Sequence, residues 1–501
     1  PRPASQRAAA FILTAAMLIT LAAPAFAETW YIENGDITVK ASGTEGKNTV
    51  SQGANQEVED TDTIITNQNQ NKASSNTVTI DANGKNDKVE VTLKDVNIEA
   101  TGGKAAVSVT GSGNTTIELD GDNHLTGGIS DNGSYGLSGI SSSGSLTISG
   151  GTVTANGGNG GYGIYSSGVT ISGGTITANG GSGKDGSGDG IFSFDPVAIS
   201  GGTVTAKGGS GEDGSGGRGI SSFGDVTISS GGTVTATGGN STGSDGSGGD
   251  GISSTSTTIS GGTVTADGGS GNFSGGNGIR SFDVAISGGT VNVAGGNGGN
   301  GSGSDVGNGI YSSDIDLSGS LELTAKAGSP NGKALSQRGN ELDLDDIKDK
   351  LGPGAKVTAI NANGDSKQVS IPRPVEPEKP VIPEESSSSS DGGSSAPSAP
   401  ASPLPGLTVT DKSGAVISYT STQSGNTLTV CVGRFTASFR ISLAALRQLR
   451  AEGIETITFQ TILCSTTLSV DELLAMGGED AEVVLTHHIR SSTLTVGGKA
   501  V

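Results

Sequence analysis

The chain has 501 residues, of which 87 are glycine, and it carries a formal net charge of −21 at pH 7. Hydrophobic residues make up 32% of the chain and aromatic residues 3%, which is too little for one large globular core. The strong negative charge argues against nucleic acid and anionic lipid, so we expect no nucleic-acid partner and no direct membrane partner.

The first 27 residues have the features of an export signal. Arg2 and Arg7 precede an apolar run over 8–23, and Ala25-Phe26-Ala27 is a small-residue cleavage signature. We therefore expect residues 1–27 to be a cleaved signal peptide and the protein to be secreted, with or without attachment to the cell surface. The alternative is an anchor that is not cleaved.

A repeat dominates the region that follows. A Gly-Ile pair recurs at spacings of 24, 27, 29, 32, 27 and 31 residues, and its isoleucines are Ile140, Ile164, Ile191, Ile220, Ile252, Ile279 and Ile310. A period of about 20–50 residues indicates a solenoid. Each unit holds three strand-like segments, which in the second unit are 163–167, 169–172 and 175–178. We predict an all-β fold, a right-handed parallel β-helix over 28–335.

Alternation of apolar and polar residues assigns the two sides of these strands. In the second unit the side chains expected to point inward are Ile164, Val169, Ile171, Ile176 and Ala178. Gly173-Gly174 should form a corner with a positive φ. A Gly-rich loop of variable length closes each unit. Because so few apolar side chains cannot order a whole unit, we expect firm strands and mobile loops unless a ligand or metal holds the loops.

Segments on either side of the repeats are expected to close the ends of the β-helix. Residues 30–39 should cover the N-terminal edge of the sheet. Residues 336–371 should form a C-terminal cap, with a short helix at 343–351 and a hairpin over 356–369. Residues 372–406 are rich in proline and then in serine, which predicts an extended linker without a core.

The remaining segment, 407–501, is expected to be a small α+β domain, whose role the sequence does not reveal. Helices are expected over 443–452 and 470–476, each preceded by a serine suited to cap it. Cys431 and Cys464 both lie in this domain. Export would permit a disulfide between them, and two buried free thiols are equally consistent with the sequence.

Three kinds of stretch in the repeat region resemble a known family. The stretches TWYIENGDITVKASG and NTTIELDGDNHLTGG and the ISGGTVTA repeats, which fall within Thr29 to Ala327, resemble secreted bacterial right-handed β-helix proteins described as carbohydrate-binding domain-containing proteins. The resemblance implies a non-catalytic protein with a pectate-lyase-like fold. It also implies binding of acidic pectic polysaccharide with calcium, as for a characterised member. No ligand-binding motif can be transferred residue by residue.

The Gly-rich loops contain acidic residues that are candidates for calcium binding. The stretches GGSGKDGSG (180–188) and GGSGEDGSG (208–216) match the calcium-binding nonapeptide only in part. Stacking of successive turns would bring several acids to one side, and clustered oxygens suit calcium. The candidate calcium ligands are Asp185, Asp189, Glu212, Asp213, Asp245 and Asp250. The alternative is that these acids are merely solvated.

Aromatic and basic residues follow several Gly-Ile pairs and are expected to point outward. Rings in register on an exposed face suit the stacking of sugar rings. The candidate ligand-binding residues are Tyr165, Phe192, Phe194, Phe223, Arg280, Phe282 and Tyr311. The alternative is that the rings turn inward and fill a corner of the coil.

A T-x-T pattern also repeats on one expected face, and it begins at Thr175, Thr203, Thr233 and Thr263. It resembles the flat threonine arrays of ice-binding β-solenoids, although threonine is in any case suited to exposed strands.

Catalysis has no convincing candidate, because the repeats contain no cluster of a base with the partners that general acid–base chemistry needs. We therefore expect a non-catalytic protein that binds polysaccharide along one face, with calcium as a bridge if the glycan is acidic. The alternative is a surface adhesin or structural spacer with a protein partner. The glycan and the oligomeric state are left open.

Overall fold

The computed structural model describes residues 28–42, 46–129, 136–184, 186–229, 231–299 and 307–372 of the repeat region. In the C-terminal region it describes 406–410, 416–417, 419–424, 426–432, 434, 436–461, 465–476, 481–487, 492–497 and 499–500. The expected signal peptide, most of the expected linker and Cys464 lie outside the described residues, so what the sequence predicts for them stays a prediction.

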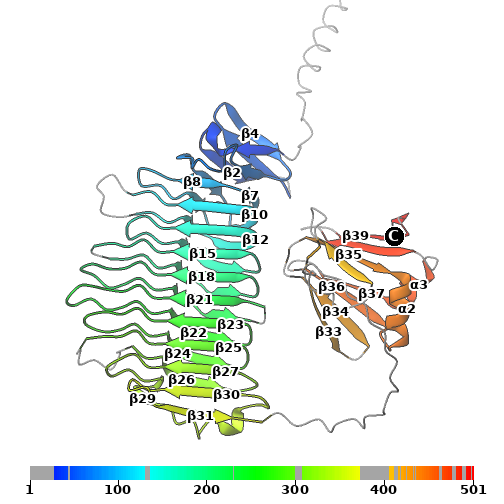
Figure 1. Cartoon of the computed structure of the whole chain (residues 1–501). Helices are drawn as coiled ribbons and strands as arrows, with labels where there is room; N and C mark the ends of the chain where they lie inside the picture. Colours follow the sequence, from blue (N-terminus) through cyan, green and yellow to red (C-terminus); the bar gives the residue numbers. More distant parts are fainter. Residues whose placement is uncertain are drawn as a thin grey trace, which may run out of the picture.

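The repeats form a β-solenoid of about 12 turns, as the sequence predicts. Figure 1 shows the turns stacked along one axis, each strand above its equivalent in the next turn. The strands pair in parallel through three columns, which we call the first, second and third faces. The first face contains β2 (Ile37–Ala41), β6 (Val78–Asp81), β9 (Val107–Thr110), β11 (Ile140–Ser142), β13 (Ile164–Ser166), β16 (Ile191–Ser193), β19 (Ile220–Ser222), β22 (Ile252–Ile259), β24 (Ile279–Ile286), β26 (Ile310–Leu317) and β28 (Leu335–Gln337).

The other two faces follow each first-face strand along the chain. The second face contains β1 (Thr29–Tyr31), β5 (Ile64–Thr66), β7 (Lys88–Lys94), β10 (Asn114–Thr126), β12 (Ser145–Asn156), β14 (Gly168–Ile171), β17 (Val197–Ile199), β20 (Val226–Ile228) and the second halves of β22, β24 and β26. The third face contains β8 (Asn97–Glu99), the second halves of β10 and β12, and β15 (Thr175–Asn179), β18 (Thr203–Lys207), β21 (Thr233–Thr237), β23 (Thr263–Asp267), β25 (Thr290–Ala294), β27 (Glu322–Lys326) and β30 (Lys356–Ile360).

The core is the aliphatic interior that the alternation predicts. Ile164, Ile171, Ile176 and Ala178 are fully buried, and the same positions in neighbouring turns are buried as well. Gly174 has a φ of +84°, which confirms the expected corner between the second and third faces.

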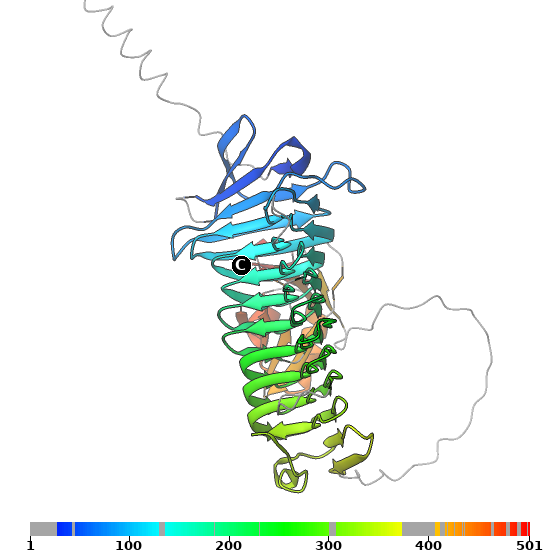
Figure 2. The same cartoon turned by 90° about the vertical axis from the view of Figure 1, so that its left-hand side faces the viewer.

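The Gly-rich loops extend from the ends of the third-face strands as long arms, which protrude on the left of Figure 1 and point toward the viewer in Figure 2. Each arm begins and ends near a glycine whose backbone hydrogen-bonds to other glycines at the bases of the arms. The amide of Gly239 donates to the Gly217 carbonyl (2.7 Å), the amide of Gly249 donates to the Gly239 carbonyl (2.9 Å), and the amide of Gly269 donates to the Gly249 carbonyl (2.8 Å). The expectation of mobile loops overlooked this glycine ladder, which holds the bases of the arms.

The glycine ladder leaves no room for side chains. A Cβ on Gly239 would collide with the carbonyl oxygen of Gly209, and one on Gly249 would collide with that of Gly217. Neighbouring arms therefore pack backbone to backbone. This close packing explains why the arms begin and end in glycine even though the loops between them vary in length.

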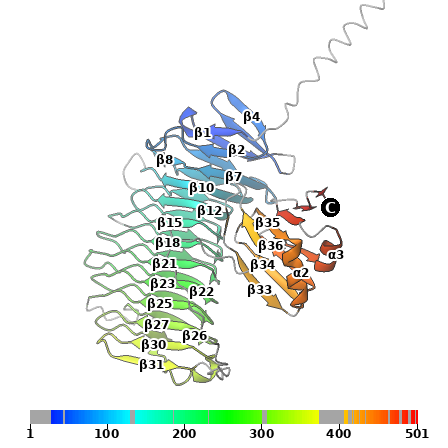
Figure 3. The same ribbon diagram turned by 45° about the vertical axis from the view of Figure 1, so that its right-hand side comes forward.

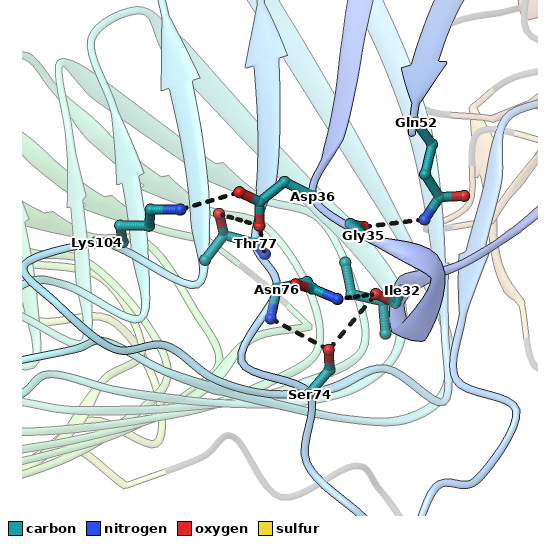
Figure 4. Close-up of polar contacts among 8 residues, drawn as sticks. All are labelled: Ile32, Gly35, Asp36, Gln52, Ser74, Asn76, Thr77 and Lys104. Atoms are coloured by element: carbon teal, nitrogen blue, oxygen red, sulfur yellow. Dashed lines mark hydrogen bonds and ion pairs between the residues drawn. The ribbon is translucent and has the colours of Figure 1, made fainter. Parts of the chain in front are cut away.

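The N-terminal end of the solenoid is closed by an antiparallel sheet of β2, β3 (Asn48–Gln52) and β4 (Asn55–Asp60), with a 3-10 turn at Ile32–Asn34. Figure 4 shows the polar contacts beneath it. Asp36 accepts hydrogen bonds from the Thr77 amide (2.8 Å) and from Lys104 Nζ (2.9 Å). Burial raises the pKa of Asp36, but these bonds outweigh it and hold that pKa below its usual value.

The C-terminal end of the solenoid matches one expectation and corrects another. The expected hairpin is present as β30 paired antiparallel with β31 (Ser366–Ser370). The helix expected over 343–351 is wrong, because only Lys348–Lys350 forms a 3-10 turn, 344–347 are turns and Leu351 forms a β-bridge with Gly319. Leu344, Ile347 and Leu351 are buried against the last turn, so packing rather than helical hydrogen bonding fixes this segment. A short strand, β29 (Asn340–Glu341), pairs with β28.

The described residues of the C-terminal region have their own core and form two sheets and two helices. One sheet contains β32 (Leu407–Thr410), β35 (Ala437–Ser442), β38 (Glu482–His487), β39 (Ser492–Val496) and β40 (Lys499–Ala500). The other contains β33 (Thr420–Ser424), β34 (Thr427–Cys431), β36 (Thr456–Gln460) and β37 (Ser465–Ser469). The helices are α2 (Leu443–Ala451) and α3 (Val470–Ala475), capped by Ser442 and Ser469 as expected.

Candidate functional site

A groove of about 680 Å³ lies between the first face and the returning parts of the arms. It runs along the solenoid axis, because its lining residues occupy equivalent positions in successive turns. Its floor is formed by the residues that precede the Gly-Ile pairs of five successive turns. These are Tyr162, Asp189, Arg218, Asp250 and Asn277. With about 4.8 Å between turns, these five positions extend over about 19 Å.

Hydrogen bonds between turns fix the floor. Asp189 Oδ1 accepts from the Arg218 amide (2.6 Å), and Asp250 Oδ1 accepts from the Asn277 amide (2.8 Å). Asn277 Oδ1 in turn accepts from the amide of Asn308 (3.0 Å). Asp189, Asp250 and Asn277 are only 7%, 6% and 2% exposed. The floor is therefore an ordered ladder in which aspartate and asparagine play the same structural part.

The charges of the groove nearly cancel. Arg218 Nε lies 3.8 Å from Asp250 Oδ2, and Arg218 Nη1 donates to Ser221 Oγ at 3.3 Å. Burial raises the pKa of Asp189 to about 6, and its contacts with Arg218 offset only part of that effect. Arg280 also lines the groove and is exposed. The groove is thus lined by two arginines and two aspartates in a chain whose net charge is −21.

The arm side of the groove is a row of hydroxyl groups. Ser187, Ser215, Ser247 and Ser274 lie on four successive arms. Ser187 Oγ donates to the Ser215 carbonyl (3.2 Å), and Ser274 Oγ donates to Ser247 Oγ (2.8 Å). This serine wall offers polar groups at the repeat distance of the turns.

Aromatic rings gather at one end of the groove. Tyr165 and Phe192 stack with their ring centroids 5.5 Å apart and their planes 7° from parallel. Phe194 and Phe223 pack edge-on against Phe192, with their ring centroids 5.1 and 5.5 Å from that of Phe192. Phe194 and Phe223 are 45% and 62% exposed, so they present ring surface to solvent.

The predicted gathering of the aromatic rings is confirmed in part, and their role in ligand binding stays a prediction. The structure brings Tyr165, Phe192, Phe194 and Phe223 together, but Phe192 is only 9% exposed, so its expected outward exposure is wrong. Neighbouring rings cover it. The sequence analysis missed Tyr162, whose ring lies 5.1 Å from that of Phe192. Its place immediately before a Gly-Ile pair, in register with Asp189, was the signal that could have found it.

The other three candidates lie farther along the axis. Phe282 is 68% exposed, and Thr255 occupies the turn between it and Phe223. Arg280 and Tyr311 are neighbours in register on β24 and β26. These residues continue the line of the cluster along the axis.

The candidate calcium ligands do not converge in the described part of the chain. Asp189 and Asp250 lie in the floor, with Arg218 in the turn between them. Glu212, Asp213 and Asp245 are exposed on the arms, and Asp213 pairs with Lys184 at 3.7 Å. Among the described residues, no group of three or more acidic, histidine or cysteine side chains could hold a metal ion. Asp185 lies outside them.

Comparisons of the chain with protein-family models, with curated proteins and with solved structures found no match. The helices described in the structure include none that is long and apolar enough to cross a membrane. The β-solenoid is therefore the level at which the chain agrees with the family that its repeats resemble.

Proposed function

We propose that the protein is secreted and binds a polysaccharide, without catalysis, in the groove along the solenoid axis. The observation that carries this proposal is that equivalent positions line the groove over five turns, with a serine repeated on four successive arms, because a polymer of similar units can meet a hydroxyl again at each step. Serine hydroxyls, carboxylates and guanidinium groups can bond sugar hydroxyls, and the exposed faces of Phe194 and Phe223 can stack on sugar rings.

The balance of charge bears on the kind of glycan. Arg218 and Arg280 offset Asp189 and Asp250, so the groove itself does not repel an anionic chain as the whole protein would. An uncharged glycan meets no electrostatic barrier there. For an acidic, pectic glycan we propose calcium as a bridge, with the exposed acids of the arms, Glu212, Asp213 and Asp245, as candidate ligands.

This proposal extends the likeness noted in the sequence. Membership of the carbohydrate-binding β-helix family would imply the same function. The groove supports polysaccharide binding independently of that resemblance. The second candidate function is a surface adhesin or spacer with a protein partner. The exposed rings of Phe194 and Phe223, which lie side by side in the aromatic cluster, favour it, because exposed apolar patches can mark protein contacts.

The test is a binding assay on soluble and insoluble polysaccharides, both neutral and pectic, with calcium and with a chelator. Phe223→Ala should weaken binding by about 2- to 10-fold, the range expected for one lost ring contact. Tyr31→Ala is the matched control, because Tyr31 is also exposed (37%) but lies at the N-terminal end, away from the groove.

Each outcome discriminates between the candidates. Binding that disappears with the chelator supports the calcium bridge, and binding that persists supports direct recognition by the groove. If the protein binds no polysaccharide under either condition, or if the two variants lose affinity equally, the proposal is wrong and the protein-partner candidate remains.

A further inference from the structure

The third face carries two unbroken columns of threonine. The outer column is Thr152, Thr175, Thr203, Thr233, Thr263 and Thr290, and the inner column is Thr154, Thr177, Thr205, Thr235 and Thr265. The valine or isoleucine between the two threonines of each strand is buried, so both side chains point outward. Strand spacing places the hydroxyls about 4.8 Å apart along the axis and about 7 Å apart along each strand, over about 24 Å.

These hydroxyls are not used by the protein. None of the eleven threonines in the two columns forms a side-chain hydrogen bond with another group in the part of the chain that the structure describes. The serines of the first face differ: Ser166 and Ser193 donate to backbone carbonyls of the corner that follows them, and Ser222 donates to the Asp195 carbonyl of the preceding turn. The hydrogen-bonding capacity of the threonine columns is therefore directed to the solvent.

The columns are not explained by a general preference of strands for threonine. The outward position of the second face contains Thr170, Ala198, Thr227, Thr258 and Ala285 in successive turns, so that column is interrupted. The first face mixes aromatic, serine and arginine side chains. Only the third face repeats two threonines without interruption, and neither column includes an ionisable group in a protein of net charge −21.

We propose that the third face binds ice. A flat array of hydroxyls at fixed repeats can hold a layer of water in a matching arrangement, and the methyl groups between them restrict where that water can lie. The two threonine columns are uncharged and regular, which suits an uncharged, regular lattice, and the charged side chains of Lys207 and Asp267 occupy the next outward position, at the ends of their strands. Figure 3 shows the strands that carry the array, β15, β18, β21, β23 and β25, one above another. This activity uses a different face from the groove.

The test measures thermal hysteresis and inhibition of ice recrystallisation by the full chain. Thr205→Arg, in the middle of the inner column, should abolish both effects because it raises a bulky charge from the flat array. Thr227→Arg is the matched control: Thr227 is an exposed threonine on a neighbouring strand of the second face, and this variant should keep both activities. Circular dichroism and melting of each variant check that it is folded.

Thr235→Val separates the hydroxyl from the shape. It keeps the size of the side chain and should reduce the hysteresis in part. The proposal is overturned if the unmodified protein has no effect on ice growth, or if the two arginine variants lose activity equally. Adsorption to crystalline cellulose without any effect on ice would also overturn it, because the array would then recognise a carbohydrate surface. Phe223→Ala should leave the ice activity unchanged, which separates this proposal from the groove.

Discussion

Replacing Asp189 with asparagine should stabilise the solenoid near neutral pH and leave its stability unchanged in acid. Asp189 is 7% exposed, and its Oδ1 accepts a hydrogen bond from the Arg218 amide. Asn277 occupies the equivalent place two turns beyond Arg218, and its Oδ1 accepts the corresponding bond from Asn308 at 3.0 Å. An asparagine at 189 therefore keeps the bond between turns and removes a buried charge.

The magnitude follows from the pKa of Asp189. Burial raises it from 3.8 to about 6, so the folded state favours the protonated form. At about 1.4 kcal/mol per pKa unit, the ionised carboxylate costs the folded protein about 3 kcal/mol, as an order of magnitude. Below pH 3.8 both states are protonated and the cost is absent. It appears as the pH rises and is complete above about pH 6.

The assay is thermal or urea unfolding of the unmodified protein and Asp189→Asn between pH 4 and pH 8. The two proteins should unfold alike at the acidic end, and the variant should become increasingly more stable up to about pH 7. Asp213→Asn, at an exposed acid on a neighbouring arm, is the control and should show little change at any pH. A difference that does not depend on pH, or a variant less stable at pH 7, would refute the reasoning.

Three further predictions concern the arms and the N-terminal cap. Gly239→Ala should lower stability by about 1–3 kcal/mol because its Cβ meets the Gly209 carbonyl, whereas Gly186→Ala has open space and should be neutral; equal melting temperatures would contradict this. In hydrogen exchange, the Gly239 amide should be protected like those of the strands, while the exposed arm residue Asp245 should exchange rapidly; equally fast exchange at both would show that the glycine ladder does not persist in solution. Asp60→Ala should cost about 1–3 kcal/mol, because the buried indole of Trp30 loses the acceptor that lies 2.8 Å from its Nε1. Trp30 is the only tryptophan, so its fluorescence reports this change directly, and an unshifted spectrum with unchanged stability would count against it.

The solenoid was predictable because its signal is local and repeated. The alternation in VTISGGTITA places Val169, Ile171 and Ile176 on one side, and the same pattern in each unit leaves only one way to stack them. The expected helix over 343–351 failed for the opposite reason. Its leucines and isoleucine pack against a single last turn, and tertiary contact overrides a weak local preference for helix.

The candidate site was harder to predict, because it depends on which turns are neighbours and on how the arms fold back. Tyr165 lies in register with Phe192 of the next turn, and Phe223 of the turn after that packs against Phe194. The aromatic cluster therefore spans three turns. The expectation of clustered acids assumed that loops stack without interruption, but Arg218 lies between Asp189 and Asp250. The glycine ladder was missed because composition marks glycine as permissive and does not show that it makes close backbone contacts.

The glycine ladder also determines where this protein can change. Each arm is fastened at its base, by Gly239 and Gly249 in one turn, so residues can be inserted or deleted beyond that point without moving the strands. The spacing of the Gly-Ile pairs already varies from 24 to 32 residues along one chain. The arms are therefore natural places to graft peptides or new recognition loops, while the aliphatic interior stays the same.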